Sequence, residues 1–192
     1  MKRFKSIKLG EMYMKTIEEL KSKLETARPE EWQLIPDIDL YMDQVIAYMK
    51  RQHIGLEDDD ETLTSAMINN YTKSGLLPRA KGKKYNREHI EYLTSICLLK
   101  QILSVNETGI LLNEQMKHKS IDEFYNAYKE VIDREYTNTA ECLTKTDKRS
   151  EISQMAVELA VSSYVQRYAC KKLVEMLAES DEPSEEKDSE EK

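Results

Sequence analysis

The sequence is poor in residues that break helices and in residues that cross-link a chain. Its 192 residues include only five glycines, four prolines and three cysteines, while 34% are charged. Few glycines and prolines in a highly charged chain favour long helices over a loop-rich or all-β fold. The cysteines are odd in number and far apart in the chain, which suits neither a disulfide framework nor a zinc site. We therefore expect an all-α protein of the reducing cytoplasm that holds no metal.

Long hydrophobic runs are missing as well. No apolar stretch approaches the ~18 residues that a membrane span needs, and none follows the basic residues at the start of the sequence. We therefore expect neither contact with a membrane nor a secretory signal. The sequence also contains no nucleophile elbow, no Cys–His pair at ligand spacing and no glycine-rich phosphate loop. These absences favour a protein that is not an enzyme and that binds no cofactor.

The acidic net charge is concentrated at one end of the sequence. Residues 179–192 contain eight acidic and two basic residues, a net charge of −6, against −7 for the whole chain. No apolar residue follows Ala178, so this segment has no surface to bury and is predicted to be a disordered acidic tail. The rest of the chain is close to neutral, and its charge does not exclude a nucleic-acid partner.

Apolar periodicity and capping residues predict a series of helices. The predicted helices cover 10–27, 38–53, 65–74, 87–103, 121–136 and 149–178, and Ser104 with Glu107 opens a further short one. Asp37, Thr64 and Asn86 are expected to cap the helices that begin after them. Residues 79–85 are expected to form a loop or small hairpin with Gly82 at its tip, and the acidic run 57–61 a solvated loop. Cys97 falls on an apolar stripe and is expected to be buried and unreactive.

One segment differs in charge from the rest of the chain. Residues 62–87 contain six basic residues and no acidic one. They are predicted to form, in this order, a short helix, a glycine, an apolar exit, a basic loop and a capped helix. This order suits a helix that lies in a DNA groove and is followed by a loop that contacts the phosphates. An ordinary solvated helix and turn is the alternative interpretation, and Tyr71 is expected in the core. The expected DNA contacts are Thr64, Ser65, Asn69, Asn70, Lys73, Arg79, Lys81, Lys83, Lys84 and Arg87.

Residues 63–78 resemble the recognition-helix region of MerR-type regulators, in which a capped helix ends in Tyr and is followed by Gly-Leu-Leu-Pro. Here Tyr71 ends the predicted helix and residues 75–78 read Gly-Leu-Leu-Pro. Tyr85, His89, Ile90 and Leu93, and then Leu103 to Glu107 with Leu111 and Leu112, resemble the family's wing end and following helices. The whole chain also resembles an uncharacterised bacterial family of MerR-like proteins. The resemblance implies a winged helix-turn-helix, a function in transcription regulation, and a homodimer paired through a helix that follows the DNA-binding domain.

The chain also departs from the MerR pattern. Asn69 stands where that family usually has a DNA-contacting arginine, the wing is shorter, and residues 54–62 replace a tight turn with an acidic loop. A helical interaction adaptor that keeps the fold without binding DNA is therefore the alternative function. An effector, if there is one, is not indicated.

The expected organisation has four parts. They are an N-terminal helical extension (1–35), a MerR-like winged helix-turn-helix domain (36–114), a C-terminal helical region (115–178) and the tail (179–192). In the C-terminal region, the apolar stripe from Ile152 to Leu177 is expected to be the seam of the dimer.

Overall fold

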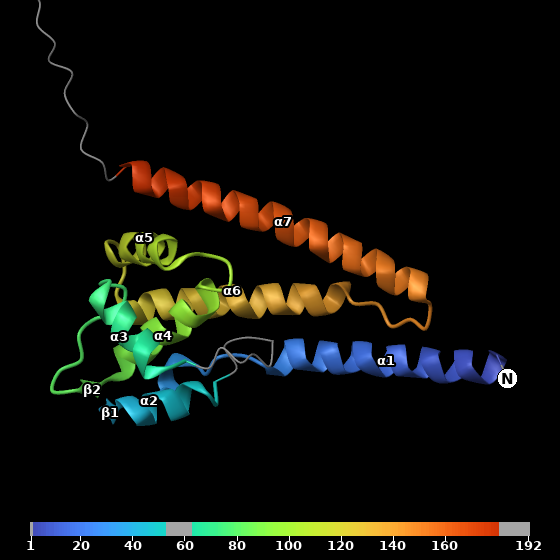
Figure 1. The fold of residues 1–192 in the computed structure, drawn as a ribbon, viewed down its shortest axis with the longest axis horizontal. Helices are drawn as coiled ribbons and strands as arrows, with labels where there is room; N and C mark the ends of the chain where they lie inside the picture. The colour runs from blue at the N-terminus through green and yellow to red at the C-terminus, as the bar shows by residue number, and fades with distance from the viewer. Residues whose placement is uncertain (1, 53–62, 181–192) are drawn as a thin grey trace, which may run out of the picture.

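The computed structural model describes residues 2–52 and 63–180 of the chain, and these form a mostly helical protein (Figure 1). The described residues contain seven α-helices, one 3-10 turn and two short strands. In chain order these are α1 (Lys2–Thr26), η1 (Trp32–Leu34), β1 (Leu40–Tyr41), α2 (Met42–Met49), α3 (Ser65–Lys73), β2 (Lys84–Tyr85), α4 (Arg87–Leu99), α5 (Val105–Met116), α6 (Ile121–Cys142) and α7 (Arg149–Ser180). The predicted all-α class is thus confirmed. Among these helices, none is both long and apolar enough to cross a membrane.

The helices separate into an elongated part and a cluster at one end. The helices α1, α6 and α7 run along the long axis of the molecule, while α2 to α5 and both strands gather at one end of it (Figure 1). Helix α6 joins the two parts because it packs on both α1 and α4, and α7 packs on α5. The segment that differs in charge therefore lies within the cluster of short elements.

Side-chain caps fix where three helices begin, as predicted. The Met67 backbone N–H donates to Thr64 Oγ1 at 3.2 Å, at the start of α3. Asn86 caps α4, and Ser104 and Glu107 form a reciprocal capping box at the start of α5. These hydrogen bonds satisfy backbone donors that the first turn of a helix otherwise leaves unpaired.

Two predicted helix starts were wrong. Helix α1 begins at Lys2 instead of residue 10, and Gly10 lies inside it, where an added Cβ would come within 3.0 Å of Asp147 Cβ. This glycine permits a close approach between chain segments and does not end the helix. Helix α2 begins at Met42 instead of residue 38, because Leu40 and Tyr41 form strand β1 and Asp37 caps nothing. A two-residue strand has no periodicity that a sequence pattern can reveal.

Four predicted helix ends also moved. Helix α2 ends at Met49 instead of 53, and turns follow it. Helix α4 ends at Leu99 instead of 103, and a turn follows before the Ser104 cap. Helix α6 continues from 136 to Cys142, since Ala140 is buried against α1 in spite of the poor helix formers around it. Helix α7 includes Ser180, past the expected boundary of the tail at 179. The rest of the tail and the acidic run 57–61 lie outside the described residues.

Two groups of buried side chains hold the fold together. The main core contains 17 buried apolar side chains between Ile35 and Tyr125, drawn from β1, α2, α3, β2, α4, α5 and α6. Tyr71 is among them with 1% of its surface exposed, so the expectation that it is a core residue is confirmed. Cys97 is half-buried against the main core, and burial raises the pKa of its thiol to about 11. A thiol with that pKa stays protonated at neutral pH, as expected of an unreactive cysteine.

The second cluster lies between the long helices and changes the interpretation of α7. It consists of Ile17, Leu24, Ala140 and Leu143, and Ile152, Met155 and Leu159 of α7 pack against it. Further along α7, Val174 is also buried. The stripe expected to be a dimer seam is therefore packed within the chain at both ends of α7, while Leu173 on the same stripe is 60% exposed.

Candidate nucleic-acid interface

Helix α3 has one buried face and one exposed face. Ile68 and Tyr71 are 0% and 1% exposed and point into the main core. Ser65, Ala66, Asn69, Asn70 and Lys73 are exposed. Their spacing of one, three, one and three residues places them on a single face of the helix. We call these five residues the outer face of α3.

The polar side chains of this outer face have no partner of their own. Ser65, Asn69, Asn70 and Lys73 make no side-chain hydrogen bond or ion pair with any residue that the structure describes. Thr64 differs from them, because its hydroxyl oxygen already accepts the cap hydrogen bond from Met67. The amides of Asn69 and Asn70 therefore keep both their donors and their acceptor for a ligand.

Helix α3 is fixed in place by contacts with α4 and by its own exit. Nζ of Lys100, the residue directly after α4, donates to Tyr71 Oη at 2.9 Å and lies 5.2 Å from the centre of the Tyr71 ring. Gly75 adopts φ +78° directly after the helix, and Leu76 and Leu77 are buried. A left-handed glycine ends the helix and turns the chain, so the apolar exit anchors the segment that follows.

The basic loop forms a tight turn that leads into strand β2, after which α4 begins. The Lys84 backbone N–H donates to the Lys81 carbonyl at 3.0 Å, and Gly82 and Lys83 have φ of +59° and +64°. Two positive φ values in the central positions are those of a type I′ hairpin turn. Strand β2 then pairs antiparallel with β1, with Leu40 opposite Tyr85 and Tyr41 opposite Lys84. The expectation of a small hairpin-like turn with Gly82 at its tip is confirmed.

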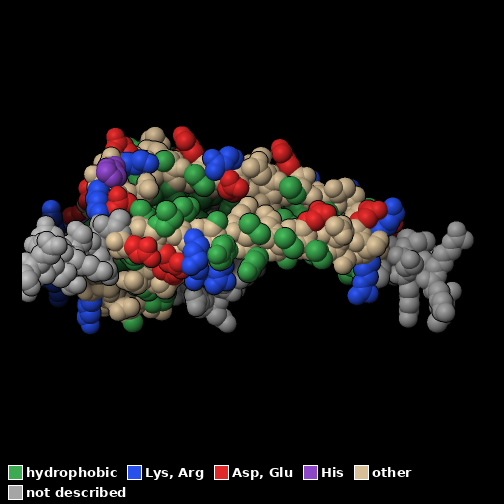
Figure 2. All heavy atoms as spheres, turned by 90° about the horizontal axis from the view of Figure 1, so that it is seen from above, with side chains coloured by type: hydrophobic (Ala, Val, Ile, Leu, Met, Phe, Trp, Pro, Cys, Tyr) green, Lys and Arg blue, Asp and Glu red, His purple; other side chains and the backbone are tan. Residues whose placement is uncertain are grey.

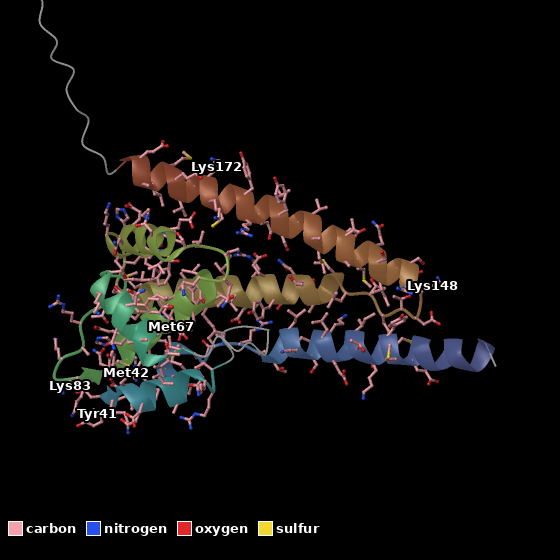
Figure 3. All side chains as sticks on the ribbon, in the orientation of Figure 1. Tyr41, Met42, Met67, Lys83, Lys148 and Lys172 are labelled. Atoms are coloured by element: carbon pink, nitrogen blue, oxygen red, sulfur yellow. The ribbon has the colours of Figure 1, made fainter. Side chains whose placement is uncertain are left out.

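This turn presents a group of exposed cations. We call Arg79, Lys81, Lys83 and Lys84 the basic wing; all four are exposed, and none makes an ion pair within the described part of the chain. Lys83 lies at the same end of the molecule as Tyr41 and Met67, far from Lys148 at the other end (Figure 3). The basic wing therefore places four positive charges at the same end of the molecule as α3, and Lys73 of the outer face adds a fifth.

Strand β1 contributes a residue that the sequence pattern did not reveal. Tyr41 is 53% exposed, and Lys84 Nζ lies 5.8 Å from the centre of its ring. The two residues are brought together by the β1–β2 pairing, across 43 positions of the chain. Tyr41 thereby adds an aromatic hydroxyl at the edge of the basic wing.

Arg87 does not belong to the basic wing, and the contacts that it makes within the protein do not favour its predicted role as a DNA contact. Its guanidinium carbon lies 4.6 Å from the centre of the Trp32 ring, and Nη2 lies 3.9 Å from Asp37 Oδ2. Only 17% of its side chain is exposed. Arg87 therefore ties the start of α4 to the segment after α1, with its charge already directed at groups inside the protein.

His89 and Glu91 lie buried behind the basic wing on α4. The Asn86 backbone N–H donates to His89 Nδ1 at 3.2 Å, and burial lowers the pKa of this imidazole. Burial, with a smaller contribution from Asp122, raises the pKa of the Glu91 carboxyl to about 7. Neither Glu91 oxygen has a hydrogen-bond partner among the described residues. His89 therefore adds no cation, and Glu91 no anion, to the exposed surface.

The described residues offer little space or chemistry for a small ligand. A cavity of about 30 Å³ between α3 and α4, lined by Met67, Tyr71, Cys97, Lys100 and Gln101, has room for little more than water. No group of three or more His, Cys, Asp or Glu side chains in the described part of the chain is placed to hold a metal ion. The chemistry of this end of the molecule is that of an exposed polar helix face beside a set of cations.

Comparison with known proteins identifies a family. No curated protein and no solved structure gave a significant match. A family model described as "Domain of unknown function (DUF1836)" matches residues 30–131, which is more than half of the chain. The matched residues include the outer face of α3, the basic wing, and α4, which supports both. The protein therefore belongs to the DUF1836 family.

Proposed function

We propose that this protein is a DNA-binding transcriptional regulator that contacts duplex DNA through α3 and the basic wing. One observation carries the proposal: an exposed polar helix face, whose polar side chains have no partner among the described residues and which includes Lys73, lies at the same end of the molecule as the four exposed cations of the basic wing (Figure 3). Cations that neutralise phosphates supply affinity without regard to sequence, and short polar side chains on a helix can reach base edges. A surface that combines the two is suited to a DNA groove and its flanking backbone.

The elements around this surface support a MerR-like winged helix-turn-helix. Helix α2 packs on α3, α4 packs behind α2, and the β1–β2 pair carries the turn between α3 and α4. In this arrangement α3 enters the major groove, and the basic wing lies on the adjacent phosphates. The tie between Tyr71 and Lys100 holds the helix at a fixed position relative to the wing.

A salt titration tests this function. We expect log affinity for random duplex DNA to fall with log salt at a slope of about −3.6 per subunit if four of the five cations contact phosphates. The double variant Lys83→Asn and Lys84→Gln should reduce the magnitude of that slope by about 1.8. Asparagine suits position 83 because it tolerates the positive φ of Lys83, so the turn should be kept.

The control removes two charges from the other end of the molecule. Lys15→Gln with Lys148→Gln changes the net charge equally, but Lys148 lies far from the wing (Figure 3) and Lys15 is on α1. We expect this control to keep the slope of the unmodified protein. Equal slopes for both double variants, or no binding at low salt, would refute the proposed function.

We further propose that the partner of the regulator is a second copy, paired through the outward surface of α7. Val157, Val161, Tyr164, Val165 and Tyr168 are each 55–72% exposed. Their spacing places them on one stripe, on the side of α7 opposite to the residues that pack inside the chain. Figure 2, which views the molecule from the side of α7, shows hydrophobic side chains along this surface. We call these five residues the outer stripe.

Size and charge favour an antiparallel pairing of two outer stripes. In an antiparallel register centred between Tyr164 and Val165, Val161 lies opposite Tyr168 of the second copy, and Glu158 lies near its Lys172. A parallel pairing would instead set tyrosine on tyrosine and lysine on lysine, which costs both packing and charge repulsion. Two-fold symmetry then gives the dimer two α3 helices for two half-sites on one duplex.

The outer stripe also favours the second candidate function, a helical adaptor that binds proteins and not DNA. Exposed apolar side chains at helical spacing on one helix are typical of an interaction surface. The salt titration separates the two functions, because an adaptor keeps its self-association through α7 while showing no salt-dependent binding to duplex DNA.

A further inference from the structure

We infer that the base pairs under α3 are adenine–thymine pairs, read in the major groove by Asn69 and Asn70 with Ala66 beside them. This inference rests on the proposed function, since it names the class of DNA that the α3 surface recognises. It follows from which side chains form the outer face of α3 and which are absent from it.

The residues available for base reading are few and all short. A recognition helix contacts base edges mainly with its N-terminal residues, which here are Ser65, Ala66 and Asn69, followed by Asn70 one turn after Ala66. All four are exposed. Lys73 stands in the last turn of the helix, nearest the basic wing, where a phosphate contact suits it better.

The chemistry of these side chains matches one base pair. An asparagine amide can donate a hydrogen bond through its NH2 group and accept one through its oxygen. Adenine offers an N7 acceptor and an N6 donor in the major groove, so the two form a bidentate pair. A small apolar side chain such as Ala66 fits the thymine methyl group in the same groove. Serine bonds to either kind of base pair. The outer face of α3 thus carries two groups suited to adenine and one suited to thymine.

The side chains that read other bases are missing from this outer face. Guanine is most often read by a bidentate arginine, and the amino group of cytosine by aspartate or glutamate. The outer face of α3 contains neither an arginine nor an acidic residue. The arginine at position 79 lies after Pro78, outside the helix. Guanine–cytosine pairs therefore offer α3 no matched contact.

The test compares three duplexes of about 24 base pairs by fluorescence anisotropy at one salt concentration. The first is a mixed A·T sequence, the second a G·C sequence of the same length, and the third the A·T sequence with 7-deaza-adenine in place of adenine. The third duplex keeps Watson–Crick pairing and the minor groove but lacks the N7 acceptor. We expect the first duplex to bind at least about fivefold more tightly than either of the others.

Variants assign the preference to the two asparagines. Asn69→Ala and Asn70→Ala should each reduce the ratio of A·T to G·C affinity, with little change in binding to the G·C duplex. Asn126→Ala is the matched control, since Asn126 is an exposed asparagine on α6. It should leave all three affinities unchanged.

The outcomes separate this inference from the function on which it rests. No binding to any duplex at low salt would overturn the proposed function. Salt-dependent binding with equal affinity for all three duplexes would overturn only the inference. A preference for A·T that survives both 7-deaza-adenine and the two asparagine variants would also overturn it, because the preference would then come from the shape of the DNA.

Discussion

Glu91 is an acidic residue whose side chain lies in the interior of the protein. It is 1% exposed, it lacks a hydrogen-bond partner among the described residues, and burial raises the pKa of its carboxyl to about 7 from 4.5. Because the folded-state pKa is the higher one, folding favours the protonated acid. The cost of ionising Glu91 in the fold therefore appears as pH rises through 4.5 and is complete above pH 7.

The variant Glu91→Gln should remove this pH dependence. We expect it to stabilise the fold by about 2–3 kcal/mol more at pH 8 than at pH 5, where the native carboxyl is already protonated in the folded protein. Urea unfolding at the two pH values measures the difference. Glu130→Gln, an exposed change on α6, is the control and should act alike at both. A similar gain at both pH values for Glu91→Gln would contradict the prediction.

Substitution of Arg87 should have the opposite effect on stability: it should destabilise the fold and leave DNA binding unchanged. Since its guanidinium packs on Trp32, Arg87→Gln should reduce the free energy of unfolding by about 1 kcal/mol. The salt slope of DNA binding should stay as it is in the unmodified protein. A slope that falls in magnitude by about 0.9 would return Arg87 to the phosphate contacts.

The comparison of these residues shows how far the sequence predicts the site. Ser65, Asn69, Asn70 and Lys73 lie on one exposed face because they share one helix, and helical spacing is visible in the sequence. The internal contacts of Arg87 could not be predicted because its partners, Trp32 and Asp37, lie more than 45 positions away, and no local pattern encodes that contact. The sequence shows how many charged residues there are, whereas the structure shows which of them already have a partner.

At the scale of the element, the helix starts that have a side-chain cap were predictable, whereas the starts of α1 and α2 and several helix ends were not. Thr64, Asn86 and Ser104 cap their helices through hydrogen bonds that span three residues, so the sequence contains both partners. The ends of α4 and α6 depend instead on what each helix packs against. Strand β1 depends wholly on its pairing with β2, and the pattern of residues 38–53 suggested a helix in its place.

Removing the cap of α3 should weaken that element measurably. Thr64→Ala is expected to reduce the free energy of unfolding by about 1 kcal/mol, because the Met67 backbone N–H loses its acceptor. Ser65→Ala, one position along and without a hydrogen bond of its own in the described part of the chain, should change stability by much less. Thermal unfolding of both variants checks this, and equal losses would show that the cap contributes nothing.

At the scale of the whole molecule, the two sides of α7 should respond differently to charge. Val161→Glu with Val165→Glu should leave a folded monomer, because both side chains are more than half exposed in the single chain and belong to the outer stripe. Leu159→Glu should instead lower the melting temperature, since Leu159 packs on the second cluster. Sedimentation at micromolar concentration, with circular dichroism for folding, measures both effects.

Leu173→Glu is the control for these variants. It introduces a charge at an exposed position of α7 that belongs neither to the outer stripe nor to the residues that pack inside the chain. It should change neither the oligomeric state nor the melting temperature. An unmodified protein that sediments as a 22.5 kDa monomer at that concentration would contradict the dimer.

Because its hydrophobic interior forms two clusters, the protein should unfold locally in two separate parts. Every residue of the main core lies within the stretch 30–131 that the family model matches, and every residue of the second cluster lies outside it. Two interiors without shared side chains behave as separate cooperative units, and the smaller unit opens at a lower free energy. In native-state hydrogen exchange, amides of α1 should exchange well before those of α4. Local opening of α1 would then leave α3 and the wing folded, so loss of the second cluster need not abolish binding by the part of the molecule that holds the main core.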